Sequence, residues 1–119
     1  QEFTFDVLVK ALGDRNRRVR RAAAARLVYL HTRMEEENWI REVLPHLLGL
    51  MTHECKHTRR MVIGKIDIWV RWARVPKQIV RNAQLLEPIC QALAQETDTE
   101  VLRRFQHLIV HVLEANKED

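Results

Sequence analysis

Apolar residues recur every three or four positions along most of the chain, which is the spacing that places them on one face of an α-helix. The segment from Asn16 to Arg33 shows this clearly, with Val19, Ala23, Leu27 and Leu30 expected to face inward. No stretch alternates apolar and polar residues for long enough to predict a strand. The pattern therefore predicts an all-α chain.

Residues that start and stop helices set the expected boundaries. Gly13 is expected to end the first helix in a left-handed conformation, Pro76 to stop the fourth, and Pro88 to bend the fifth. Turns are expected near Asp14, His53 and Thr97. The predicted helices are Thr4–Leu12, Asn16–Arg33, a third from the glutamates 35–37 to Met51, Thr58–Arg74, Ile79–Gln95, and a sixth from Asp98 or Thr99 through Leu113.

The helices also follow a period. When Leu12 is set beside Leu50 and Leu93, the offsets are 38 and 43 residues, close to the period of about 40 to 47 residues of two-helix repeats. A small residue precedes each leucine (Ala11, Gly49 and Ala92), and these residues are expected at close helix contacts. Unrelated amphipathic helices that overlay by chance are the alternative.

The period predicts one domain over residues 1–119, an α-solenoid of about three stacked antiparallel helix pairs. The pairs are expected at about residues 1–33, 36–75 and 78–116. Because solenoids need polar capping repeats at their ends and none is evident here, the chain is expected to be part of a longer protein.

Leu12-Gly13-Asp14, followed by Val19-Arg20 and the alanines 22–24, resembles the HEAT repeat. The second and third repeats match less well, since Thr52 and Gln95 stand in place of the aspartate. The resemblance implies that Asp14 and Arg20 belong to a hydrogen-bonded ladder between repeats. It also implies a non-enzymatic scaffold or adaptor that binds another protein, without cofactors.

Composition limits the class of protein further. No apolar run approaches the roughly 18 residues that span a bilayer, and no charged-then-apolar leader opens the chain. The two cysteines, Cys55 and Cys90, are too few for a disulfide scaffold, so free thiols are expected. These features predict an intracellular protein of the cytoplasm or nucleus that does not bind membranes.

Arginines cluster at the starts of the second, fourth and sixth predicted helices, although the net charge is only +4. Stacking would align them into a basic edge for an acidic segment of a partner protein. Nucleic acid is the alternative partner, and the interpretation without any partner is that these arginines satisfy turn carbonyls and neighbouring acidic residues. Trp69 is expected in the core, whereas Trp72 is equally compatible with the core and with an interface anchor. The candidate partner-binding residues are Arg17, Arg18, Arg21, Arg59, Arg60, Arg71, Trp72, Arg103 and Arg104.

His53-Glu54-Cys55-Lys56-His57 matches the H-E-x-x-H pattern of zinc hydrolases, a minor alternative function. That chemistry needs both histidines on one helical face and a third ligand. The predicted turn falls across the motif, so we expect no metal site and no catalysis.

Overall fold

The computed structural model describes residues 5–71 and 77–117, and all regular secondary structure within them is helical. The all-α prediction is therefore confirmed. None of the helices in this part of the chain has the length and apolar character needed to cross a bilayer. The elements are α1 (Phe5–Ala11), α2 (Arg17–Arg33), α3 (Glu36–Asn38), the π-helical turn η1 (Trp39–Val43), α4 (Leu44–Gly49), the 3-10 turn η2 (Leu50–Thr52), α5 (Lys56–Arg71), α6 (Lys77–Asn82), α7 (Leu86–Gln95) and α8 (Thr99–Ala115).

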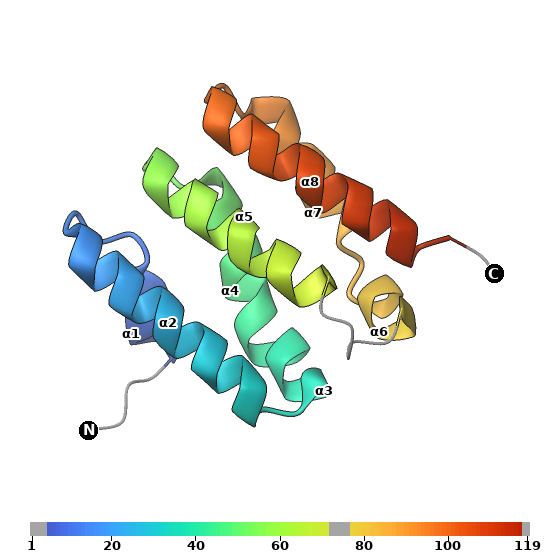
Figure 1. The fold of residues 1–119 in the computed structure, drawn as a ribbon, viewed down its shortest axis with the longest axis horizontal. Coiled ribbons are helices and arrows are strands. Elements are labelled where there is room, and N and C mark those ends of the chain that lie inside the picture. The colour runs from blue at the N-terminus through green and yellow to red at the C-terminus, as the bar shows by residue number, and fades with distance from the viewer. Residues whose placement is uncertain (1–4, 72–76, 118–119) are drawn as a thin grey trace.

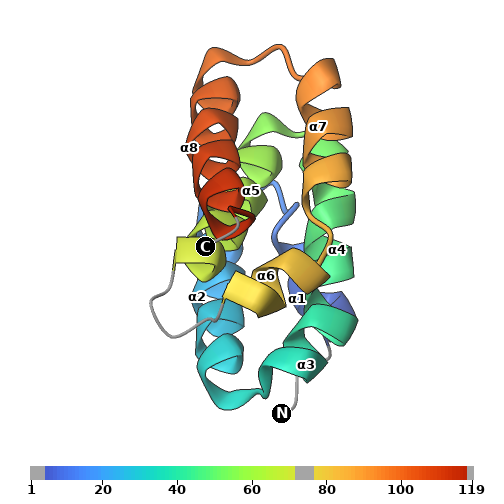
Figure 2. The same ribbon diagram turned by 90° about the vertical axis from the view of Figure 1, so that its right-hand side faces the viewer.

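The longer helices form two layers. Figure 1 shows α2, α5 and α8 side by side in front, all running in the same direction. Figure 2 shows α1, α4 and α7 in the second layer, with α3 and α6 at one end of the molecule. The central helix α5 contacts α2 and α8 within its own layer, and α4 and η2 in the other. This position makes α5 the helix on which the placement of the others depends.

The apolar core fills the space between the two layers. Trp69 of α5 is fully buried and stacks on Trp39 of η1, with ring centroids 4.8 Å apart. The indole Nε1 of Trp69 donates to Glu36 Oε2 at 2.8 Å, so its one polar atom keeps a partner inside the protein. The expectation that Trp69 belongs to the core is confirmed.

Side-chain caps begin the first and last helices of the front layer where the sequence predicts turns. Asn16 Oδ1 accepts the N–H of Arg18 at 2.8 Å, and Asp98 Oδ2 accepts the N–H of Val101 at 3.1 Å. These bonds satisfy N–H groups that have no partner within the first turn of a helix. The expected turns near Asp14, His53 and Thr97 are confirmed.

Two of the three prolines lie in the described part of the chain and behave differently, whereas Pro76, the residue expected to stop the fourth helix, lies outside it. The π-helical turn η1 lies just before Pro45. A proline within a helix crowds the carbonyl one turn back and has no N–H to donate to it, and a wider π turn relieves both problems. Pro88 lies in the first turn of α7, where a missing N–H costs nothing, and it produces no bend. The predicted fifth helix is instead divided at Gln84, whose φ of 51° is left-handed.

Two expectations about the first helix pair are wrong. Gly13 does not have a positive φ, because α1 ends by tightening, with Gly13 N–H donating to Lys10 O and Asp14 N–H to Ala11 O. Val19 is 37% exposed, whereas Ala23 and Leu27 are buried as predicted. Val19 therefore lies outside the buried stripe of α2, which includes Arg20, Ala23, Ala24 and Leu27.

Arg20 and Arg59 make the same pair of hydrogen bonds in successive turns. Nη1 of Arg20 donates to the carbonyls of Asp14 (2.9 Å) and Arg15 (3.1 Å). Nη1 of Arg59 donates to those of His53 (2.8 Å) and Glu54 (3.1 Å). The two arginines lie 39 residues apart, one more than in the overlay of leucines.

Asp14 and Arg20 do not form the hydrogen bonds between repeats that the HEAT resemblance implied, because their hydrogen bonds lie within the turn between α1 and α2. Asp14 Oδ1 accepts the N–H of Asn16, and the bonds of Arg20 stay within the first helix pair. Between pairs, Thr58 Oγ1 donates to Leu12 O at 3.0 Å. Arg59 also donates from Nε and Nη2 to both oxygens of Glu96, at 2.8 and 3.1 Å.

We predict opposite effects of enlarging two of the small residues expected at close contacts. Ala92 is buried, so Ala92→Leu should lower the free energy of unfolding by about 1 to 3 kcal/mol through overpacking. Gly49 is exposed and helical, and a Cβ there would meet nothing within 4 Å, which corrects the expectation of a close contact. Gly49→Ala should therefore raise stability by up to about 1 kcal/mol. Urea denaturation of both variants tests this, and a destabilised Gly49→Ala would contradict the packing described here.

The Arg59–Glu96 pair predicts a pH dependence. Burial alone would raise the pKa of the Glu96 carboxyl, but hydrogen bonds from Arg59 and from the N–H groups of Asp98 and Thr97 hold it below its usual value. A lowered folded-state pKa stabilises the protein above the unfolded value of about 4.3, and this contribution is lost as the pH falls through the folded-state pKa. Glu96→Gln should cost about 1.5 to 3 kcal/mol at pH 7.

The difference between wild type and Glu96→Gln should shrink when urea midpoints are measured at successively lower pH below about 4. A pH-independent difference would show that the carboxylate charge does not stabilise the fold.

Candidate functional site

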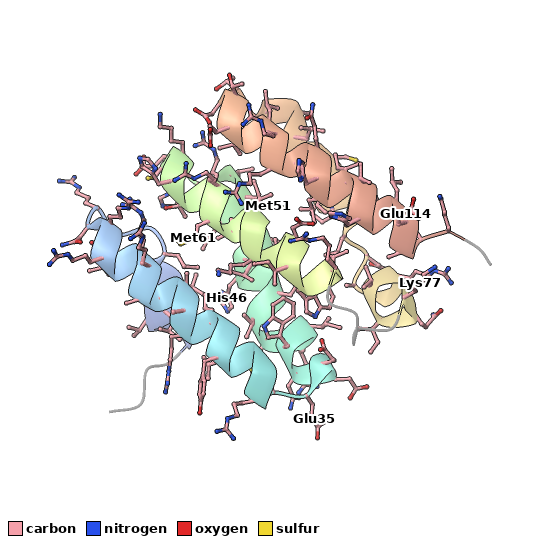
Figure 3. All side chains as sticks on the ribbon, in the orientation of Figure 1. Glu35, His46, Met51, Met61, Lys77 and Glu114 are labelled. Atoms are coloured by element: carbon pink, nitrogen blue, oxygen red, sulfur yellow. The ribbon has the colours of Figure 1, made fainter. Side chains whose placement is uncertain are left out.

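A groove of about 420 Å³ lies between α2 and α5, with one side chain contributed by α8. Figure 3 shows Met61 in the space between the two helices, and Met61 belongs to the lining of this groove. Basic side chains dominate the lining and no aspartate or glutamate belongs to it. The lining residues are Arg17, Arg20, Arg21, Ala24, Ala25, His57, Arg60, Met61, Gly64, Lys65, Ile68 and Arg104.

Helical spacing brings these residues to one surface. Arg17, Arg21 and Ala24 follow one face of α2, and Arg60, Gly64 and Ile68 follow the facing side of α5. Arg104 reaches the groove from α8, and its Nη1 would lie 3.4 Å from a Cβ at position 64. Because Gly64 has no side chain, the guanidinium of Arg104 on α8 can lie close to α5 at this point.

Most of the groove's cations have no neutralising partner. Among the described residues, no carboxylate lies within 4.0 Å of Arg17, Arg21 or Arg104. Arg60 Nη1 lies 3.5 Å from Glu100 Oε2, an exposed pair that solvent screens. Arg20 is only 8% exposed and donates to the turn carbonyls. A cluster of this kind produces a positive potential that attracts anions.

The titratable groups of the groove respond to this environment. Partial desolvation, followed by the positive charges of Arg20, Arg60, Lys56 and Arg17, lowers the pKa of His57. Burial lowers the pKa of Lys65, whose stem lies along the groove wall. An anion bound here would favour the protonated form of His57, because it would offset the surrounding positive charge.

The structure brings together only part of the basic edge predicted from the sequence. Arg17, Arg21, Arg60 and Arg104 line the groove. Arg18 and Arg103 are exposed on α2 and α8 but are absent from its lining, because each is rotated away from α5 relative to its neighbour. Their helical positions could not be oriented from the sequence without knowing which faces of α2 and α8 pack.

The remaining residues assigned to a binding site from the sequence are Arg59, Arg71 and Trp72. Arg59 is held in the turn by Glu96 and two carbonyls. Arg71 Nε pairs with Asp67 Oδ2 at 3.4 Å, as its i, i+4 spacing indicated, and Asp67 Oδ1 lies 2.6 Å from His111 Nδ1. Trp72 lies outside the described residues. Arg59 and Arg71 are absent from the groove lining.

Sequence reasoning missed the middle and far end of the groove. Lys65 and Ile68 were not assigned to any site, and Arg20 and His57 were assigned only to other features. Their spacing from Arg60 and Met61 along α5 is a signal that could have found Lys65 and Ile68. That signal identifies a face of α5, but only packing shows that the face is open.

The H-E-x-x-H sequence does not lie within one helix. His53 has an extended ψ of 148° after η2, and its Nδ1 accepts the N–H of Cys55 at 3.0 Å. His57 is the second residue of α5. The two histidines therefore do not share a helical face, and residues 5–71 and 77–117 contain no cluster of three His, Cys, Asp or Glu side chains suited to a metal ion.

Comparison with protein-family profiles, curated proteins and solved structures finds no match to this chain.

The electrostatics of the groove can be tested at His57. Arg60→Gln removes a positive charge that opposes protonation of the imidazole, so the pKa of His57 should rise. Arg18→Gln changes the net charge equally but lies outside the groove, so it should move the pKa less. NMR titration of the histidine ring protons measures both. Equal shifts would mean that only the net charge of the protein matters.

Proposed function

We propose that this chain is a non-enzymatic, HEAT-like scaffold segment that binds an acidic segment of a partner protein in the groove between α2 and α5. The observation on which this rests is the lining itself, with six lysines and arginines from three helices and no carboxylate. Arginine favours such a role because its planar guanidinium can bind a carboxylate through two parallel hydrogen bonds.

The repeat interpretation is supported by the shared chemistry of successive turns. Arg20 and Arg59 occupy the fourth position of α2 and α5 and bond to equivalent carbonyls. The same direction of α2, α5 and α8 is also what stacked helix pairs would produce (Figure 1). A rigid array of this type already has an ordered backbone, so binding loses little free energy to ordering the scaffold.

An acidic protein segment fits the groove better than nucleic acid does. Single-stranded nucleic acids bind to aromatic side chains on which their bases stack, and the lining contains none apart from the imidazole of His57. The lining instead includes aliphatic and small side chains, among them Ala24, Met61 and Ile68. This combination of guanidinium groups and aliphatic surface suits a peptide.

The proposal can be tested with a rhodamine-labelled peptide of four consecutive glutamates in a Gly-Ser background. Fluorescence anisotropy should detect binding that weakens as salt is raised. The double variant Arg21→Glu with Arg104→Glu should reduce affinity by about tenfold or more, because it reverses two charges in the groove.

Arg18→Glu with Arg103→Glu is the matched control, since it makes the same charge change on the same two helices outside the groove. It should retain most of the binding, and urea midpoints should show that both double variants fold. Equal losses in the two variants would contradict a groove-specific site. Tighter binding of single-stranded oligothymidylate through the same arginines would assign the groove to nucleic acid instead.

A further inference from the structure

The groove differs in chemistry between its two ends. Arg17, Arg20 and Arg21 of α2 lie beside His57 and Arg60 of α5 at the end where both helices begin. Because α2 and α5 run in the same direction, the positive ends of their helix dipoles add to these charges (Figure 1). This end of the groove is therefore the place for the anionic part of a ligand.

The opposite end has a larger share of apolar side chains. Ala24 and Ala25 of α2 and Met61, Gly64 and Ile68 of α5 line it together with the cations Lys65 and Arg104, and no acidic residue lies among them. Ile68 is a large aliphatic side chain that is 45% exposed. Because exposed apolar area beside a groove is stabilised when a partner covers it, this end suits an aliphatic side chain of the ligand.

The helix itself gives the separation of the two ends. Arg60 and Ile68 are eight residues apart in α5, which corresponds to about 12 Å along the helix axis. An extended peptide advances about 3.3 Å per residue, so about four residues bridge that distance.

We infer that the groove recognises an extended peptide segment in which an acidic cluster lies about four residues from a large aliphatic side chain. The acidic cluster contacts Arg17, Arg21 and Arg60, and the aliphatic side chain packs on Ile68. Lys65 lies between the two ends, where its ammonium group can donate a hydrogen bond to a backbone carbonyl of the ligand. This inference rests on the proposed function and specifies the kind of segment bound.

The test uses the tetraglutamate peptide and derivatives with one leucine placed one, four or nine residues from the nearest glutamate, on either side. The leucine-free peptide should bind the wild-type protein in a salt-dependent manner. A leucine four residues away, in at least one of the two orders, should tighten binding about tenfold, since burying most of a leucine side chain is worth that much. Leucine at one or nine residues should add little.

Ile68→Ser should remove the gain from leucine, expressed as the ratio of affinities for the two peptides. Val110→Ser is the matched control, because Val110 is also an exposed aliphatic residue, at 55%, and lies on α8 outside the groove lining. It should leave the ratio unchanged, and urea midpoints establish that both variants fold.

The possible failures are distinguishable. If the leucine-free peptide binds but leucine adds the same amount at every offset, or nothing at any, the spacing inference is wrong while the proposed function stands. If Val110→Ser removes the gain and Ile68→Ser does not, the aliphatic contact lies elsewhere and the inference is also wrong. If the leucine-free peptide does not bind the wild-type protein, the proposed function and this inference both fail.

Discussion

The guanidinium group of Arg59 holds two turns of the molecule together. It donates to the carbonyls of His53 and Glu54 in its own turn and to both carboxylate oxygens of Glu96 in the next. Glu96 in turn accepts the N–H groups of Thr97 and Asp98 just before α8 begins. The Glu96 side chain is only 2% exposed, and a buried charge that loses its partner is strongly destabilising. Within the residues that the structure describes, this is the most buried of the ion pairs that join the start of α5 to the start of α8, the other two being Lys56–Asp98 and Arg60–Glu100.

The hydrogen bonds of Arg20 and Arg59 determine which arginines remain available to bind an anionic ligand. Arg20 and Arg59 satisfy turn carbonyls, and the Arg59 charge is neutralised by Glu96. With α8 fixed against α5, Arg104 lies over Gly64 and joins the arginines of α2 around a groove without carboxylates. A modest net charge of +4 thus becomes a concentrated positive potential at one place, since the acidic residues lie elsewhere.

The sequence predicted the helices and turns well because both follow from local signals. Apolar spacing identified the helices, and Asn16 and Asp98 act as the caps that their side chains suggested. The errors concern properties that depend on distant residues. The residues near Arg59 in the sequence do not show that it pairs with Glu96, 37 residues away, and is therefore not free to bind a partner. Nor do the residues of α2 show that Arg21 lines the groove and Arg18 does not. The division of the fifth predicted helix at Gln84 and the tightened end of α1 at Gly13 also lack a strong residue signal.

The central claim is that anionic segments bind among Arg17, Arg21, Arg60 and Arg104 and not over the arginines in general. The most direct measurement is an NMR titration of the arginine Nε–H resonances with the unlabelled tetraglutamate peptide. This account predicts saturable shifts for those four arginines and for the Gly64 amide, with Arg18 and Arg103 little changed. Shifts of similar size in Arg18 and Arg103, or shifts concentrated on any other face, would contradict it.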